Sequence, residues 1–213
     1  MFWRFGGYAN ISTIDTILDK PDLTLEELLD ESDLIQELKQ QNSKLVEFLR
    51  EESVLHKLLC YVVADKPLQD AKSTSSDSPE EKTKGISFFA KAKSRSRSKS
   101  VNKSLDTDDG DEDKSEAQRK KYAYVACEVL SCDVWSISEA LIEYQHHLRE
   151  FWDFLKRPAP LDALQAGYFT KVNDSLFDKK TDDMLPFFRS LDNIIPLMLK
   201  HVESQWSWIC SSK

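Results

Sequence analysis

Two apolar, helix-patterned stretches flank a polar segment that holds few large apolar residues, and this division most constrains the fold. Leu, Ile, Val and Phe recur through residues 1–64 and 120–202, whereas residues 65–119 are rich in Ser, Asp, Glu and Lys. A segment of that composition buries too little apolar surface to offset the conformational entropy lost on ordering. We therefore expect one helical domain interrupted by a disordered insertion over residues 65–119.

Capping signals and apolar periodicity predict helices on both sides of this insertion. Thr24 with Glu27 has the form of a capping box ahead of a leucine-rich stretch, and Ser12 with Asp15 resembles one. The apolar stripe that follows is interrupted around Gln40–Ser43. Further caps are expected at Asp133, Thr181 and Asp192. Strand-like alternation is absent, so we predict an all-α fold, a HEAT/armadillo-like α-solenoid of antiparallel helix pairs.

The composition excludes several classes of protein. Four cysteines in 213 residues are too few for a disulfide scaffold, and five glycines argue against Gly-rich nucleotide loops. No apolar run reaches the roughly 18 residues of a membrane span. The opening MFWRFGGYANIS lacks the basic start and apolar core of a secretory signal. We therefore expect a protein with no membrane segment in a reducing compartment, the cytoplasm and in addition the nucleus.

No pattern in the sequence predicts catalysis, a metal or a cofactor. His146 and His147 are the most metal-like pair, but adjacent helical residues point about 100° apart, which disfavours a shared ion. Cys127 and Cys132 lack a second Cys/His pair at zinc spacing, so they are expected to be core cysteines. No serine lies in a G-x-S-x-G elbow. The sequence therefore predicts a protein that is not an enzyme and has no cofactor.

The tract KAKSRSRSKS inside the insertion is a phosphorylation candidate. Arg95 lies three residues before Ser98, and Arg97 lies three before Ser100, a spacing that basophilic kinases accept. Each phosphate would add about −1.5 to −2 charge, so a phosphorylated tract would lose its basic character. The predicted sites are Ser96, Ser98, Ser100 and the proline-directed Ser78. Protein kinases are therefore expected partners of the insertion.

An alternative function for the same tract is nucleic-acid association in the nucleus through the Arg/Ser stretch 94–100. Six Lys or Arg at 91–104 are followed by six Asp or Glu at 106–113. Adjacent blocks of opposite charge neutralise one another, which weakens counterion release on binding a polyanion. We therefore expect nucleic-acid binding to be the less favoured reading.

Three large aromatic residues stand at the start of the chain, where termini usually carry polar residues. Phe2, Trp3 and Phe5 either fold back on the helix that holds Ile11 and Ile14, capping the solenoid, or form an anchor for a partner protein. Both readings stay open, with capping favoured because an exposed aromatic cluster promotes aggregation.

Several segments together resemble the start of a SAPS domain. They are MFWRF, TLEELLDESDLIQELKQQNSKLVEFL, YAYVACEVLSCDV and FDKKTDDMLPFFRSLDNIIPLMLKHV. The resemblance implies a non-catalytic regulatory subunit that binds a serine/threonine phosphatase catalytic subunit of the phosphatase 6 type, within the type-2A-like group. Members of that family continue beyond the LKHV segment with more helical repeats. The resemblance thus implies an N-terminal portion followed by a divergent tail at 203–213.

Overall fold

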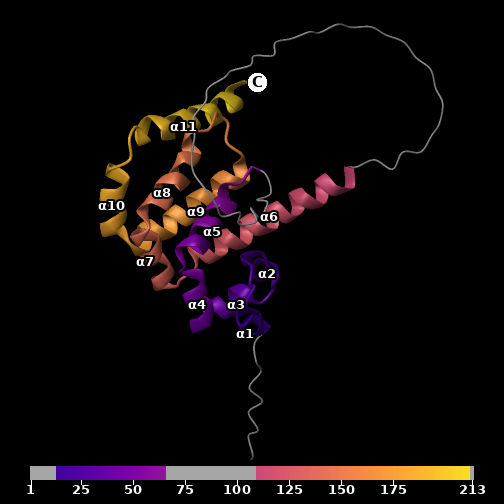
Figure 1. Ribbon diagram of the computed structural model, residues 1–213. Coiled ribbons are helices and arrows are strands. Elements are labelled where there is room, and N and C mark those ends of the chain that lie inside the picture. Colours follow the sequence, from indigo (N-terminus) through magenta and orange to yellow (C-terminus); the bar gives the residue numbers. More distant parts are fainter. Residues whose placement is uncertain (1–12, 66–108, 212–213) are drawn as a thin grey trace, which may run out of the picture.

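The computed structural model describes residues 13–65 and 109–211, and within these two ranges every regular element is helical (Figure 1). No strand occurs in the described ranges, so the all-α prediction is confirmed. None of the helices in the described part of the chain is both long and apolar enough to cross a bilayer. The elements are α1 (Thr13–Leu18), α2 (Leu25–Asp30), α3 (Leu34–Lys39), α4 (Ser43–Leu49), α5 (Glu52–Val63), α6 (Asp109–Ser131), α7 (Trp135–Glu143), α8 (Gln145–Trp152), the 3-10 helix η1 (Asp153–Lys156), α9 (Ala163–Lys179), α10 (Thr181–Arg189) and α11 (Ile194–Ser211).

Short helices with local caps form the first part of the stack. The side chain of Thr24 accepts a hydrogen bond from the backbone N–H of Glu27 at 3.3 Å, so the predicted cap of α2 is confirmed. Gln41 has a φ of 58°, a left-handed conformation that ends α3. Asn42 then accepts the N–H of Leu45 and starts α4. The predicted interruption around Gln40–Ser43 is therefore confirmed.

Helices α5, α6 and α9 pack against one another at the centre of the stack, and Figure 1 shows α5 beside α6. Apolar side chains at helical spacing face this contact, because one stripe of each helix must leave water. The fully buried ones include Leu55, Leu58 and Val62 on α5, Ala126, Val129 and Leu130 on α6, and Val172 and Leu176 on α9. The core therefore joins helices on both sides of residues 66–108.

An aromatic cluster attaches the last helices to this core. The ring of Trp152 on α8 lies 5.3 Å from that of Phe169 on α9 and 5.6 Å from that of Phe188 on α10, with edge-to-face geometry. Phe187, also on α10, lies 6.4 Å from Trp152. Such pairs contribute about 0.5–1.5 kcal/mol each beyond their buried area. These contacts pack α10 against α8.

Helix α6 begins at Asp109, ten residues before the predicted end of the insertion at 119. Residues 116–121 of this helix are held by charge pairs that apolar periodicity does not reveal. Arg119 donates two hydrogen bonds to the Glu116 carboxylate, at 2.8 and 2.7 Å, and one to the backbone oxygen of Ala64 at 2.7 Å. The hydrogen bonds from Arg119, with a further one from Lys120, lower the pKa of Glu116 to about 2. Lys121, just beyond the predicted insertion, reaches Asp30 at 2.6 Å, so charged contacts hold the stretch 116–121 of α6.

Three predicted caps are wrong. Helix α7 is preceded by Val134 with no side-chain cap, so Asp133 does not cap it. Thr181 is the first residue of α10, and its hydroxyl donates to the carbonyl of Phe177 on α9. Between Asp192 and α11 stands Asn193, with a φ of 55°. In each case the connection between two packed helices determines where the next helix begins. Ser12 lies outside the described residues, and α11 continues to Ser211 through most of the predicted tail.

Candidate functional site

The site residues predicted from sequence lie outside the part of the chain that the structure describes. This holds for the opening aromatics Phe2, Trp3 and Phe5. It also holds for the phosphorylation candidates Ser78, Ser96, Ser98 and Ser100, and for the Arg/Ser stretch 94–100. Their proposed roles therefore stay predictions. The described residues offer two other features, an exposed apolar stripe and a cluster of histidines.

Helix α11 carries an apolar stripe that faces solvent. Ile195, Met198, Leu199 and Val202 follow the spacing of one helical face, i, i+3, i+4 and i+7. Their exposed fractions are 54%, 41%, 55% and 51%. These four residues are called the α11 stripe below. Exposed apolar side chains that lie together on one face often mark a protein-binding surface.

Contacts on the opposite side of α11 fix the direction in which the stripe points. Ile194 is buried, and Leu197 packs against the core. His201 Nε2 lies 2.8 Å from the backbone oxygen of Leu155, and Lys200 donates to the backbone oxygen of Arg157 at 3.2 Å. Helix α11 is therefore anchored on η1 along one side, while the stripe remains available on another.

A cleft of about 580 Å³ opens between the α8–η1 segment and the α10–α11 connection. Its lining mixes charge and apolar surface: Arg149, Glu150, Trp152, Asp153, Lys156, Leu191, Asp192, Asn193, Ile194 and Leu197. Arg149 is held there by a 2.7 Å hydrogen bond to the Ser190 hydroxyl. Because Ile194 and Leu197 also belong to α11, the cleft and the stripe lie on the same terminal helix.

Trp135, on α7, is a further exposed apolar residue that the sequence analysis did not predict. It is 60% exposed, and the Lys180 ammonium lies 3.9 Å from the centre of its ring, a cation–π contact. A signal was present, because Trp135 is two positions before Ile137 and therefore lies off the stripe of Ile137 and Leu141 that packs inward. An apolar residue off the buried stripe of an amphipathic helix is expected at the surface.

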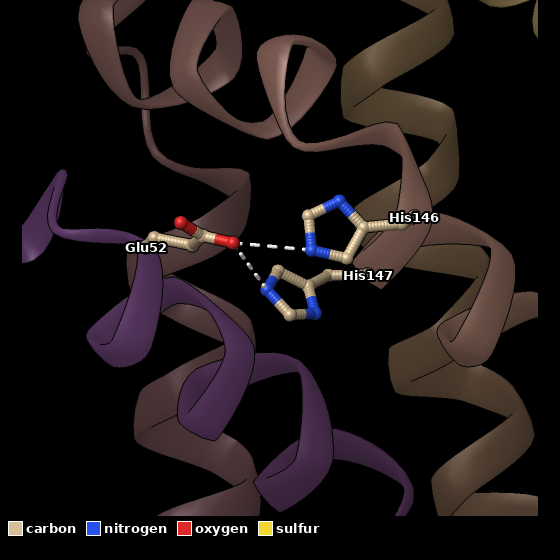
Figure 2. A group of neighbouring side chains, drawn as sticks. All are labelled: Glu52, His146 and His147. Carbon is tan, nitrogen blue, oxygen red and sulfur yellow. Dashed lines mark hydrogen bonds and ion pairs between the residues drawn. The ribbon is translucent and has the colours of Figure 1, made fainter.

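Five side chains of α5 and α8 form the second feature, called the histidine cluster: Glu52, His56, His146, His147 and Glu150. Figure 2 shows one Glu52 oxygen pointing at both neighbouring histidines. Glu52 Oε1 lies 3.1 Å from His146 Nε2 and 3.2 Å from His147 Nε2. On the other side of His147, His56 Nε2 lies 3.1 Å from Glu150 Oε2. Imidazole and carboxylate groups at such distances are able to bind one another or a cation.

This convergence contradicts the geometric argument made from sequence. Tyr144 has φ −94° and ψ 54°, which ends α7 and begins α8 at Gln145. The two histidines therefore occupy the first turn of α8, and their ring centres lie only 3.8 Å apart. The side chains of His146 and His147 thus turn toward α5, and both Nε2 atoms reach the same Glu52 oxygen although the two residues are adjacent.

Among the described cysteines, Cys127 is buried, whereas Cys60 and Cys132 are only partly buried. Burial raises the pKa of the Cys127 thiol to about 11, with opposing influence from Lys171. Burial also raises the pKa values of Cys60 and Cys132. A thiol that stays protonated is a poor nucleophile and a poor metal ligand. The interpretation of Cys127 as a core residue agrees with its complete burial.

Comparison with known proteins finds relatives along nearly the whole chain. No family model matches the chain, and no solved structure does. The extragenic suppressor of kinetochore protein 1 of Schizosaccharomyces pombe is 34% identical over 209 residues, which are 96% of this chain and 20% of that protein. The human serine/threonine-protein phosphatase 6 regulatory subunit 1 is 32% identical over 202 residues, 95% of this chain and 18% of that protein.

A third relative matches a shorter part of the chain. The SIT4-associating protein SAP185 of Saccharomyces cerevisiae is 38% identical over 82 residues, 38% of this chain and 8% of that protein. The chain spans about a fifth of the length of the relatives that it matches along most of its residues. These matches confirm the resemblance seen in the sequence motifs. The homologues of this chain are SAPS-domain proteins, among them the SIT4-associating proteins and the phosphatase 6 regulatory subunits.

Proposed function

We propose that this chain is a non-catalytic regulatory module that binds a type-2A-like serine/threonine phosphatase catalytic subunit, of the phosphatase 6 or SIT4 type, and directs its activity. One observation carries the proposal: 32% identity to the human phosphatase 6 regulatory subunit 1 extends over 95% of the chain. This identity covers helices both before and after residues 66–108, so the relative matches the whole helical stack and not one half of it. A stack of helices that presents an extended surface suits a scaffold.

Two apolar features are candidates for the contact with the catalytic subunit. One is the α11 stripe, whose four side chains are each about half exposed. Covering a half-exposed side chain of this size stabilises a complex by about 1 kcal/mol. The other is the group Phe2, Trp3 and Phe5, which remains a prediction because it lies outside the described residues. Trp residues are enriched among those that dominate binding energy.

Binding to a recombinant phosphatase 6 catalytic subunit tests the function, and three variants test the contact. Leu199→Asp changes the α11 stripe, and Trp3→Ala changes the opening aromatics. Tyr124→Asp is the matched control, because Tyr124 on α6 is 51% exposed but lies outside both candidates. We expect the wild-type chain and the control to capture the catalytic subunit, and at least one of the other variants to lose it. The chain alone should hydrolyse no phosphorylated substrate.

Loss of capture only in Tyr124→Asp would exclude both candidate contacts. Failure of the wild-type chain together with a longer protein of the family, tested in the same assay, would overturn the proposed function. Melting curves of each variant control for unfolding, since a surface substitution changes stability by only about 0.5 kcal/mol.

The insertion supplies a second, regulatory part of the proposal. Phosphorylation of Ser96, Ser98 and Ser100 by protein kinases would replace a basic tract by an acidic one. Mass spectrometry of the chain purified from its own cells checks these sites and Ser78. If the Arg/Ser stretch 94–100 did bind nucleic acid, the affinity should fall steeply with salt, whereas phosphatase capture through apolar contacts should not.

A further inference from the structure

Ligand-type side chains from two helices meet in the histidine cluster. Glu52 and His56 are four residues apart on α5, and His146, His147 and Glu150 occupy neighbouring positions on α8. The ligand atoms of Glu52, His146 and His147 all lie within 4.8 Å of one another. Helices α5 and α8 pack together, so the backbone already holds these groups at the same place.

The distances agree with coordination of one metal ion by Glu52, His146 and His147. Around a tetrahedral Zn²⁺ with metal–ligand bonds of about 2.0–2.1 Å, neighbouring ligand atoms are about 3.3 Å apart. The Glu52 oxygen lies 3.1 and 3.2 Å from the two histidine nitrogens. Two histidines and one glutamate are a zinc ligand set, and they leave a fourth position for water or a further ligand.

His147 is the central residue of the cluster, with one ring nitrogen toward each carboxylate. Its side chain is only 13% exposed, and its Nδ1 is buried with no hydrogen-bond partner. Glu150 Oε2 lies 3.6 Å from this Nδ1. A metal-bound histidine usually presents its second ring N–H to a carboxylate. His147 is placed to bind a metal through Nε2 and to direct Nδ1–H toward Glu150.

The packing of the rings favours a metal over two simultaneous ion pairs. The ring of His147 lies 4.2 Å from that of His56, stacked at 17°, and 3.8 Å from that of His146. Three imidazolium charges so close together would repel one another. Both His146 and His147 approach the same Glu52 oxygen, and one carboxylate neutralises only one of them. Neutral imidazoles avoid this repulsion and present a lone pair to a cation.

We propose that Glu52, His146 and His147 form a binding site for a divalent transition metal of the Zn²⁺ type, with Glu150 orienting His147. Imidazole and carboxylate ligands suit Zn²⁺ among the common divalent metals. The bound ion joins α5 to α8, and therefore joins the parts of the chain before and after residues 66–108. Its fourth position faces solvent, because His146 is 59% and Glu52 49% exposed.

Zn²⁺ titration of the full-length, tag-free chain tests this site, by calorimetry and by thermal melting with and without EDTA. His146→Ala and Glu52→Gln each remove one ligand from an exposed position. His201→Gln is the matched control, because His201 is the one of the four histidines of the chain that lies outside the cluster, on α11. Co²⁺ binding to the wild type reports the ligand atoms by its absorption spectrum, independently of any variant.

We expect one Zn²⁺ per chain and a higher melting temperature that EDTA reverses. Each ligand variant should bind about tenfold more weakly or worse, as typically follows loss of a group that supports a metal site. The control should bind like the wild type, and the Co²⁺ spectrum should show nitrogen and oxygen ligands without thiolate bands. Absence of stoichiometric binding, equal binding by His146→Ala, or thiolate bands would each overturn the proposal and leave the cluster as an ion-pair network.

Discussion

Replacing Leu58 by Ala on α5 is the perturbation that most directly tests the packing of the helical stack. Leu58 is completely buried on the helix that packs against both α6 and α9. Truncation to Ala removes roughly three buried carbon groups, at about 0.8 kcal/mol for each. The surrounding helices cannot collapse fully into the space, because α5 is held on several sides, and the remaining cavity adds a further cost.

The expected loss in free energy of unfolding is about 3–4 kcal/mol, within the roughly 2.7–5.0 kcal/mol found for buried Leu→Ala changes. For a domain of about 150 residues this lowers the melting temperature by about 6–16 °C. Leu199→Ala on the α11 stripe is the matched control, since Leu199 is 55% exposed. It should change the free energy of unfolding by less than about 1 kcal/mol.

Urea unfolding followed by circular dichroism at 222 nm measures both variants, with the slope of the transition checked against the wild type. A loss below about 1 kcal/mol for Leu58→Ala would refute a core that runs continuously through α5, α6 and α9. A loss for Leu199→Ala as large as that for Leu58→Ala would refute the exposure of the α11 stripe.

Two further predictions concern buried polar and sulfur groups. Arg119→Met should lower the free energy of unfolding by about 1.5–3 kcal/mol, because Arg119 donates a charged hydrogen bond to the Ala64 backbone oxygen. Urea unfolding measures this loss, and an unchanged midpoint would contradict it. The Cys127 thiol, with its pKa raised from an ordinary value near 9 to about 11, should resist a thiol reagent at pH 8 until urea unfolds the chain. Because the folded state holds this proton more tightly, the contribution of Cys127 to stability is complete below pH 9 and decreases between pH 9 and 11. Rapid labelling of Cys127 in the native chain would contradict its burial.

The helical class could be predicted because local signals decide it. The Thr24 cap and the break at Gln40–Ser43 depend on residues within one turn, and the structure has both. The start of α6 could not be predicted in this way. The contacts that hold residues 116–121 of this helix join distant parts of the chain: Arg119 reaches Ala64, 55 residues away, and Lys121 reaches Asp30, 91 residues away. Periodicity and composition contain no information on such pairings.

The histidine cluster could not be found from the chain for a related reason. Glu52 and His147 are 95 residues apart, and only the packing of α5 on α8 brings them together. The adjacent pair His146-His147 was visible in the sequence, but its geometry depends on the unusual backbone at Tyr144. The α11 stripe had a clearer signal, since apolar residues occupy more than one face of that helix.

The central claim is that the helical stack binds a phosphatase catalytic subunit. Biolayer interferometry with the purified chain immobilised and a purified phosphatase 6 catalytic subunit in solution measures this directly. The account predicts saturable one-to-one binding with a Kd of about 1 μM or tighter, equivalent to about −8 kcal/mol. Absence of saturable binding, both for this chain and for a longer family member immobilised in the same way, would contradict it.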